Sequence, residues 1–270
     1  MSLDQPLTEP AIRAALETNW LGHALYVYER VGSTNTVLAR LAEEGAPTGT
    51  MVIAEYQAEG RGRQERRWQA PAGSSLLLSL LFRPRWPARQ AHWFTMLAGL
   101  AAATAIEARS SLRAALKWPN DVMIWDERYG EPQWRKAGGI LLETQLDQER
   151  LTRVVLGIGL NVNIPGADLP AGATPATSLL AAGGRPLARI PILTRLLQAL
   201  ESRYEEADAG ISPQPAWNER LVTRDQNVRV TTANEVIQGQ ALGSDEWGRL
   251  IVRTPDGEIR RFSAGDVTLR

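Results

Sequence analysis

The chain has 270 residues, of which 44% are hydrophobic and 22% charged, and its formal net charge is zero. This composition is typical of a folded globular protein and lacks the overall basic charge of most nucleic-acid-binding proteins. The lack of cysteine excludes disulfides and thiolate catalysis, and with only His23 and His92 a histidine-rich metal site is excluded as well.

The first ten residues have neither the basic start nor the apolar stretch of a signal peptide. The longest apolar run, over 74–82, is too short to cross a bilayer. The sequence therefore predicts a cytoplasmic protein without a membrane partner.

The first half of the chain alternates helical and strand patterns. Apolar residues at helical spacing predict helices, and β-branched or aromatic runs predict strands. In chain order, we expect a helix of about three turns from Thr8, a strand over 24–31, a helix capped at 33–35 and ended by Gly45, a strand over 50–57, a buried strand over 74–82, and a helix over 92–109.

The pattern continues with strands over 114–118 and 122–125, a hairpin tip over 126–133, and strands over 137–144 and 151–162. A loop rich in proline, glycine and alanine then leads to a helix over 190–207. This mixture predicts an α/β (α+β) domain built on a mixed sheet.

The composition changes near Arg224, where helical patterning ends. Five short alternating strands follow over 227–233, 236–243, 249–254, 258–263 and 266–270, with an Asp-Gly turn signal at 256–257. Short strands at this spacing are typical of a small β-barrel. We therefore expect two domains, at 1–222 and 223–270.

Lysine is rare in this chain. Of 30 Lys plus Arg residues only Lys117 and Lys136 are lysine, which leaves 30 − 2 = 28 arginines. A compact ammonium and a planar guanidinium are not interchangeable at a binding site, so two lysines in glycine- or asparagine-marked segments indicate sites of chemistry. The alternative is that both are ordinary surface charges.

The densest group of candidate residues lies in EYQAEGRGRQERRW, residues 55–68. Glycines let a backbone approach a ligand closely, and guanidiniums donate to phosphate or carboxylate. The segment is neither a Walker loop nor a dinucleotide-binding fingerprint, because the required spacings are missing. A solvated basic loop is the alternative interpretation.

Two further segments end strands with polar residues. In KWPNDV, over 117–122, Lys117, Asn120 and Asp121 could hold a nucleotide phosphate and a hydrated Mg²⁺, or only cap a turn. In GIGLNVN, over 157–163, Asn161 could read an adenine edge, although asparagines that form turns are more common.

Taken in order, five segments resemble the motifs of the biotin–protein ligases: STN at 33–35, EYQAEGRGR at 55–63, KWPNDV at 117–122, KAGGILLE at 136–143 and GIGLNVN at 157–163. The resemblance implies a catalytic domain related to class II tRNA synthetases and lipoate ligases, followed by an SH3-like domain. It also implies a two-step ATP-dependent ligation. Biotin and ATP, with Mg²⁺, form biotinyl-5′-AMP, and a lysine of a biotin carboxyl carrier domain of acetyl-CoA carboxylase or a related carboxylase then takes the biotin.

By this resemblance, biotin contacts Ser33, Thr34, Asn35, Gln57, Gly60, Arg61, Gly62, Arg63, Lys136 and Gly139. ATP or the adenylate contacts Arg63, Arg66, Trp68, Lys117, Asn120 and Asn161, and Asp121 holds Mg²⁺. Lys136, Arg61 and Arg63 are the expected catalytic residues, because they offset the repulsion between two reacting anions. Trp68 is expected to cover the nucleotide, and the missing side chains of Gly138 and Gly139 to leave room for the ligand.

The chain departs from the family pattern GRGRxGRxW at one position, where Glu65 replaces a glycine. A carboxylate there could pair with Arg63 or Arg67 and change how well the loop retains the adenylate. We expect this arginine-rich loop to be mobile until an anion binds.

About thirty residues precede Ser33, too few for the DNA-binding domain of about sixty residues found in family members that also repress transcription. The sequence therefore predicts a ligase without a DNA partner, either monomeric or homodimeric. Two alternatives remain open: a lipoate or octanoate ligase on the same fold, and a non-catalytic anion- or RNA-binding module.

Overall fold

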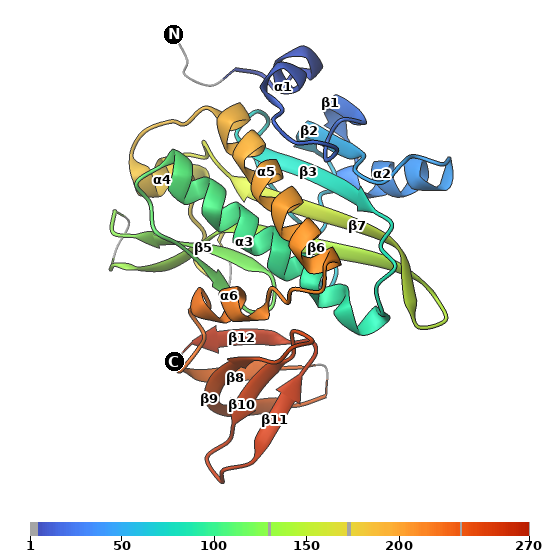
Figure 1. The fold of residues 1–270 in the computed structure, drawn as a ribbon. Coiled ribbons are helices and arrows are strands. Elements are labelled where there is room, and N and C mark those ends of the chain that lie inside the picture. Colours follow the sequence, from blue (N-terminus) through green and yellow to red (C-terminus); the bar gives the residue numbers. More distant parts are fainter. Residues whose placement is uncertain (1–4, 129–130, 172–173, 233, 270) are drawn as a thin grey trace.

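Two β-sheets of different size organise the molecule (Figure 1). The computed structural model describes residues 5–128, 131–171, 174–232 and 234–269. The larger sheet has seven strands in the order β1-β2-β3-β7-β6-β5-β4, and the smaller has five in the order β11-β10-β9-β8-β12.

The larger sheet is mixed. Its strands are β1 (Leu25–Val31), β2 (Met51–Gln57), β3 (Ser75–Phe82), β4 (Ala114–Lys117), β5 (Asp121–Asp126), β6 (Gln133–Asp147) and β7 (Arg150–Asn161). Only β1 and β2 run parallel to each other; the other neighbours in this sheet are antiparallel. Every residue of β3 is buried, as its apolar sequence predicts for a central strand.

Helices cover both faces of this sheet. On one face α3 (Ala91–Arg109) and α5 (Arg189–Asp208) lie side by side across the strands (Figure 1). Thirteen of the nineteen residues of α3 are buried, so this helix forms much of the main core. On the other face α2 (Thr34–Glu43) packs through Leu38 against Val52, Leu81 and Val155. The open part of that second face is where polar residues gather.

The smaller sheet is antiparallel and comprises β8 (Asn227–Thr231), β9 (Val236–Ser244), β10 (Leu250–Arg253), β11 (Ile259–Phe262) and β12 (Asp266–Leu269). Its β9–β10 turn packs on the larger unit, where the indole nitrogens of Trp93 and Trp118 donate to the carbonyls of Glu246 (2.8 Å) and Gly248 (2.9 Å). The guanidinium of Arg89 also lies 4.8 Å from the ring centroid of Trp247. These contacts hold the small sheet beside the KWPNDV turn.

The expected strands are confirmed within the described residues, as is the α/β fold class with its small β domain; residues 233 and 270, at the ends of two expected strands, lie outside them. The first helix, α1 (Glu9–Ala15), has seven residues and is shorter than expected. Two short helices, α4 (Leu179–Gly183) and α6 (Gln214–Glu219), and the single-turn 3₁₀ elements η1 (Ala88–Gln90) and η2 (Gly166–Asp168) were not expected. The predicted hairpin tip includes 129–130, which lie outside the described residues. No helix in the described part of the chain is long and apolar enough to span a membrane.

Candidate functional site

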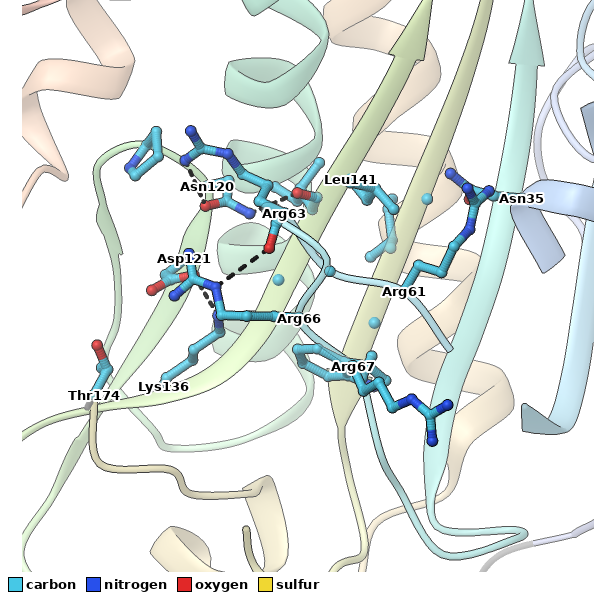
Figure 2. A pocket seen from close by; sticks show the side chains of 18 of the residues that line it. Asn35, Arg61, Arg63, Arg66, Arg67, Asn120, Asp121, Lys136, Leu141 and Thr174 are labelled. Carbon is cyan, nitrogen blue, oxygen red and sulfur yellow. Dashed lines mark hydrogen bonds and ion pairs between the residues drawn. The ribbon is translucent and has the colours of Figure 1, made fainter. Parts of the chain in front are cut away.

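A cavity of about 200 Å³ lies on the α2 face of the larger sheet. Four parts of the chain line it: the N-terminal end of α2, the arginine-rich loop over 60–68 (the lid), the sheet floor of β6 and β7, and the turn over 117–121. Strand β12 of the small sheet adds a fifth wall with Asp266, Val267 and Thr268. Figure 2 shows Asn35 and Arg61 at one end of the cavity and Asp121, Lys136 and Thr174 at the other.

Hydroxyl and amide groups form the end of the cavity near α2. The Gln57 Oε1 atom accepts hydrogen bonds from the backbone N–H of Thr34 (2.7 Å) and from its hydroxyl (3.0 Å). The buried Ser79 hydroxyl lies 2.8 Å from Thr34 Oγ1 and 2.6 Å from Asn35 Oδ1. Ser33, the N-cap residue of α2, is buried beside them. This end therefore offers both donors and acceptors in fixed positions.

Two glycines of β7 make room for side chains on the sheet floor. A Cβ atom on Gly157 would collide with the Asn35 amide, and one on Gly159 would lie 2.6 Å from the Trp68 indole. A Cβ on Gly139 of β6 would lie 3.0 Å from the same indole. We expected the missing side chain of Gly139 to leave room for the ligand. In the structure the Trp68 indole fills part of that space. Its indole nitrogen is buried without a hydrogen-bond partner in the described chain.

The lid folds as a hairpin, with a bridge between Arg61 and Arg67, and its mobility without an anion stays a prediction. The Trp68 N–H donates to the Gly60 carbonyl (2.9 Å), and Gly62 N–H donates to the Arg66 carbonyl (2.6 Å). The tip closes with Arg66 N–H donating to Arg63 carbonyl oxygen (3.1 Å) across residues 64 and 65. Both tip residues have left-handed backbones, with φ of 53° at Gln64 and 59° at Glu65. The tip is therefore a turn of the kind that favours Asn-Gly.

Three lid arginines each reach a different element. Arg61 pairs with Glu143 of β6 at 2.9 Å, and Arg66 pairs with Asp266 of β12 at 2.7 Å. The Arg63 guanidinium donates to the Asn120 amide oxygen at 3.4 Å. Burial lowers the pKa of Arg63 below its ordinary value, and the neighbouring Asp266 partly offsets this.

The two lysines of the chain line the same cavity, as we expected. Lys136 Nζ lies 2.6 Å from Asp121 Oδ1 and 5.8 Å from the Trp68 ring centroid. Lys117 Nζ donates to the Thr174 hydroxyl at 3.0 Å. Burial lowers the pKa of Lys117; Asp121 raises it and Lys136 lowers it further. An anion placed between these ammonium groups would be stabilised by both.

Three expected features differ in the structure. Asn161 is buried and does not line the cavity: its amide nitrogen donates to the Thr177 carbonyl (3.1 Å), and its Oδ1 has no partner among the described residues. Gly60 lies at the base of the lid, outside the cavity lining. Glu65 forms no ion pair with Arg63 or with any other described residue, so the expected pairing is absent here.

Sequence reasoning missed Ser79, Glu143, Thr174 and the residues of β12. Ser79 had a weak signal, because it is a hydroxyl inside an apolar strand. Glu143 closes the quoted segment KAGGILLE but had no assigned role. Thr174 and Asp266 enter the site through tertiary packing, which no local pattern indicates.

The carboxylates of this cavity do not form a metal cluster. In the described ranges, no three His, Asp or Glu side chains gather as metal ligands would. Asp121 of β5 and Asp266 of β12 are the two carboxylates among the described residues that line the cavity. Two carboxylates suit a hydrated Mg²⁺, which keeps several waters and needs only one or two carboxylates.

Comparison with known proteins identifies the family. The model of the Biotin/lipoate A/B protein ligase family matches residues 27–161, and that of the Biotin protein ligase C terminal domain matches residues 224–270. The chain is 35% identical to the biotin–acetyl-CoA-carboxylase ligase of Mycobacterium tuberculosis over 277 residues, which covers 98% of this chain and 96% of that protein. It is 34% identical to the bifunctional ligase/repressor BirA of Bacillus subtilis over 266 residues, with coverage of 97% and 79%.

Solved structures agree with the sequence comparison. The biotin protein ligase from Aquifex aeolicus in complex with biotin and ATP superposes with a TM-score of 0.72 at 26% identity, covering 92% of this chain and 99% of that one. The order of the five motifs, the two matched domains and these relatives all agree. This chain therefore belongs to the biotin/lipoate A/B protein ligase family, with the C-terminal domain of the biotin protein ligases.

Proposed function

We propose that this chain is an ATP-dependent biotin protein ligase. The biotin carboxylate attacks the α-phosphate of ATP to give biotinyl-5′-AMP and pyrophosphate. The amine of a carrier lysine then attacks the acyl carbon and releases AMP. The observation that carries this proposal is the polarity of one cavity: donors and acceptors at its α2 end, and two lysines at the other.

The α2 end suits the ureido ring of biotin. A ureido group has both N–H donors and a carbonyl acceptor, and the Thr34 hydroxyl, Asn35 and Gln57 supply matching groups. Trp68 and Leu141 give the cavity apolar walls for the bicyclic ring. A lipoyl or octanoyl chain has no ureido group and would make no use of these fixed donors and acceptors.

The opposite end suits the reacting anions. Lys136 and Lys117 would lie beside the carboxylate and the phosphates, and Arg63 would contribute a third positive charge. Fixed cations placed where charge develops stabilise a phosphoryl-transfer transition state. The closed lid would also keep water from the mixed anhydride.

Adenine recognition is proposed for Asn161. Its buried Oδ1 has no donor in the described part of the chain, and the exocyclic amino group of adenine is a donor of the right kind. Because Asn161 now bonds to Thr177, contact with a nucleotide requires the segment around Thr177 to shift. Asn120, Arg66 and Trp68 line the cavity and are proposed as further nucleotide contacts.

We propose that Asp121 holds the Mg²⁺ that accompanies ATP; because its Oδ1 lies 2.6 Å from Lys136 Nζ, the ion would have to take the other carboxylate oxygen or displace that ammonium. The ion would neutralise phosphate charge and orient the α-phosphate. The carrier is proposed to be a biotin carboxyl carrier domain of acetyl-CoA carboxylase, because relatives are named for that substrate. A domain boundary near 222 is supported by the match of the C-terminal family at 224–270.

The direct test is mass spectrometry of a carrier domain incubated with this protein, biotin, ATP and Mg²⁺. The expected result is one added biotin in the wild-type reaction and a much slower addition, by about 10²–10³-fold, with Lys136→Ala. Thermal denaturation with biotin or lipoate in parallel separates the two ligase specificities. Stabilisation by lipoate alone, or an unmodified carrier, would contradict the proposal.

A further inference from the structure

A surface groove lies directly behind the α2 end of the ligand cavity. Residues of α2, β6 and β7 form it, together with one lid residue: Thr36, Ala39, Arg61, Glu143, Thr144, Arg153 and Val155. Among the described residues, Arg61 is the only one that lines both the groove and the ligand cavity. One side chain therefore separates the two spaces at this point.

Glu143 holds that side chain in place from the groove side. The Arg61 Nη2 atom lies 2.9 Å from Oε1 and 3.0 Å from Oε2 of Glu143. Glu143 Oε2 also accepts a hydrogen bond from the Asn35 amide nitrogen at 2.9 Å. Glu143 itself does not line the cavity, so it acts on the ligand only through Arg61 and Asn35.

The Asn35 amide is locked from both sides. Its Oδ1 lies 2.6 Å from the Ser79 hydroxyl, and its Nδ2 donates to Glu143. A Cβ atom on Gly157 would collide with it, so the strand leaves no room for another position. Asn35 and Arg61 therefore form one rigid end wall, which Figure 2 shows opposite Lys136 and Thr174.

We propose that Glu143 is a positioning residue that sets the head-group specificity of the ligase. By holding Arg61 in place, Glu143 closes the α2 end of the cavity. Biotin then fits, whereas a biotin analogue with a substituent on its ureido group is excluded. This inference rests on the proposed function, because it takes biotin to bind with its ureido ring at the α2 end.

The physical reason is that, among the described residues, only Glu143 bonds to the Arg61 side chain. Its side chain is 46% exposed, and a long exposed side chain without a partner regains its rotamers in solvent. Loss of Glu143 would therefore open the cavity into the groove. The pair is too exposed to contribute much to folding, so the opening need not unfold the protein.

The test compares biotin with biotin that carries a propyl group on a ureido nitrogen, in ATP–pyrophosphate exchange by the full chain. The wild type is expected to prefer biotin strongly in kcat/KM, and Glu143→Ala is expected to reduce this preference about ten-fold or more. For biotin itself, KM should rise more than kcat falls, since Glu143 touches no reacting atom. Glu143→Gln should lose part of the preference: its amide oxygen can still accept from Arg61 and Asn35, but its amide nitrogen would face the Arg61 donor that now lies 2.9 Å from Oε1.

Thr144→Ala is the matched control, since Thr144 lines only the groove, and it should leave the preference unchanged. Arg61→Ala removes the other half of the pair and should relax the preference even if Glu143→Ala does not fold. An unchanged preference for biotin in both Glu143→Ala and Arg61→Ala would overturn the inference. So would a loss of this preference in Thr144→Ala as large as that in Glu143→Ala. A wild type that does not turn over biotin would instead contradict the proposed function.

Discussion

At the scale of single residues, Lys136 is closely confined by its neighbours. Its Nζ lies 2.6 Å from Asp121, and its Cε would lie 3.5 Å from a Cβ atom on Gly139. Lys136→Ala is expected to slow adenylate formation by about 10²–10³-fold, as loss of one transition-state donor does elsewhere. Lys136→Arg keeps the charge but not the compact shape, and should form the adenylate at least about ten-fold more slowly than the wild type. Biotin-dependent ATP–pyrophosphate exchange measures both, and a wild-type rate in Lys136→Arg would contradict the argument from shape.

Lys117 couples the site to pH and to stability. Its pKa is lowered from 10.5 by burial, so the unfolded chain binds this proton more tightly than the folded protein. Below the lowered pKa the buried charge destabilises the fold by a constant amount, and this cost disappears as pH rises toward 10.5. Lys117→Met should therefore raise the melting temperature at pH 7, with a gain that shrinks as the solution becomes more alkaline. Calorimetry across this range checks it, and ATP affinity should fall in the same variant.

At the scale of elements, the lid tip stores strain. Residues 64 and 65 have left-handed backbones without being glycine, which costs about 1 kcal/mol or more per residue. Glu65→Gly should favour the closed hairpin by about 1 kcal/mol and slow adenylate release about five-fold. Glu65→Ala removes the carboxylate but keeps the strain, and should release at the wild-type rate. Equal release from all three proteins, measured by chase with unlabelled ligand, would exclude this explanation.

The same scale shows how far the sequence predicts the structure. The strands, the long helices and the lid could be predicted because periodicity and contiguous motifs are local signals. Helices α4 and α6 could not, since helices of five and six residues are held by packing rather than by propensity. For the same reason the lid residues were found from their motif, whereas Glu143 and Ser79 reach the site only through strand pairing across the sheet.

At the scale of the whole molecule, the small sheet completes the active cavity. Its β9–β10 turn accepts the indole hydrogen bond of Trp118, next to the cavity lysine at 117, and its strand β12 contributes Asp266. Asp266 pairs with Arg66 at the tip of the lid. The C-terminal domain therefore contacts the lid directly, through the Arg66–Asp266 ion pair.

This arrangement predicts that Arg66 and Asp266 act together in retaining the adenylate. Each side chain is about half exposed, so their coupling is expected to be about 0.5–1 kcal/mol, or two- to five-fold in release rate. Arg66→Ala and Asp266→Ala should each speed release of the adenylate. The release rate of the double variant should be lower than the product of the two single effects predicts. Arg67→Ala is the control, because Arg67 lies in the same lid without an ion pair among the described residues, and its effect should multiply with that of Asp266→Ala. If the effects of Arg66→Ala and Asp266→Ala also multiply, the lid closes without help from the small sheet. If the ion pair is the source of the coupling, raised salt should abolish it.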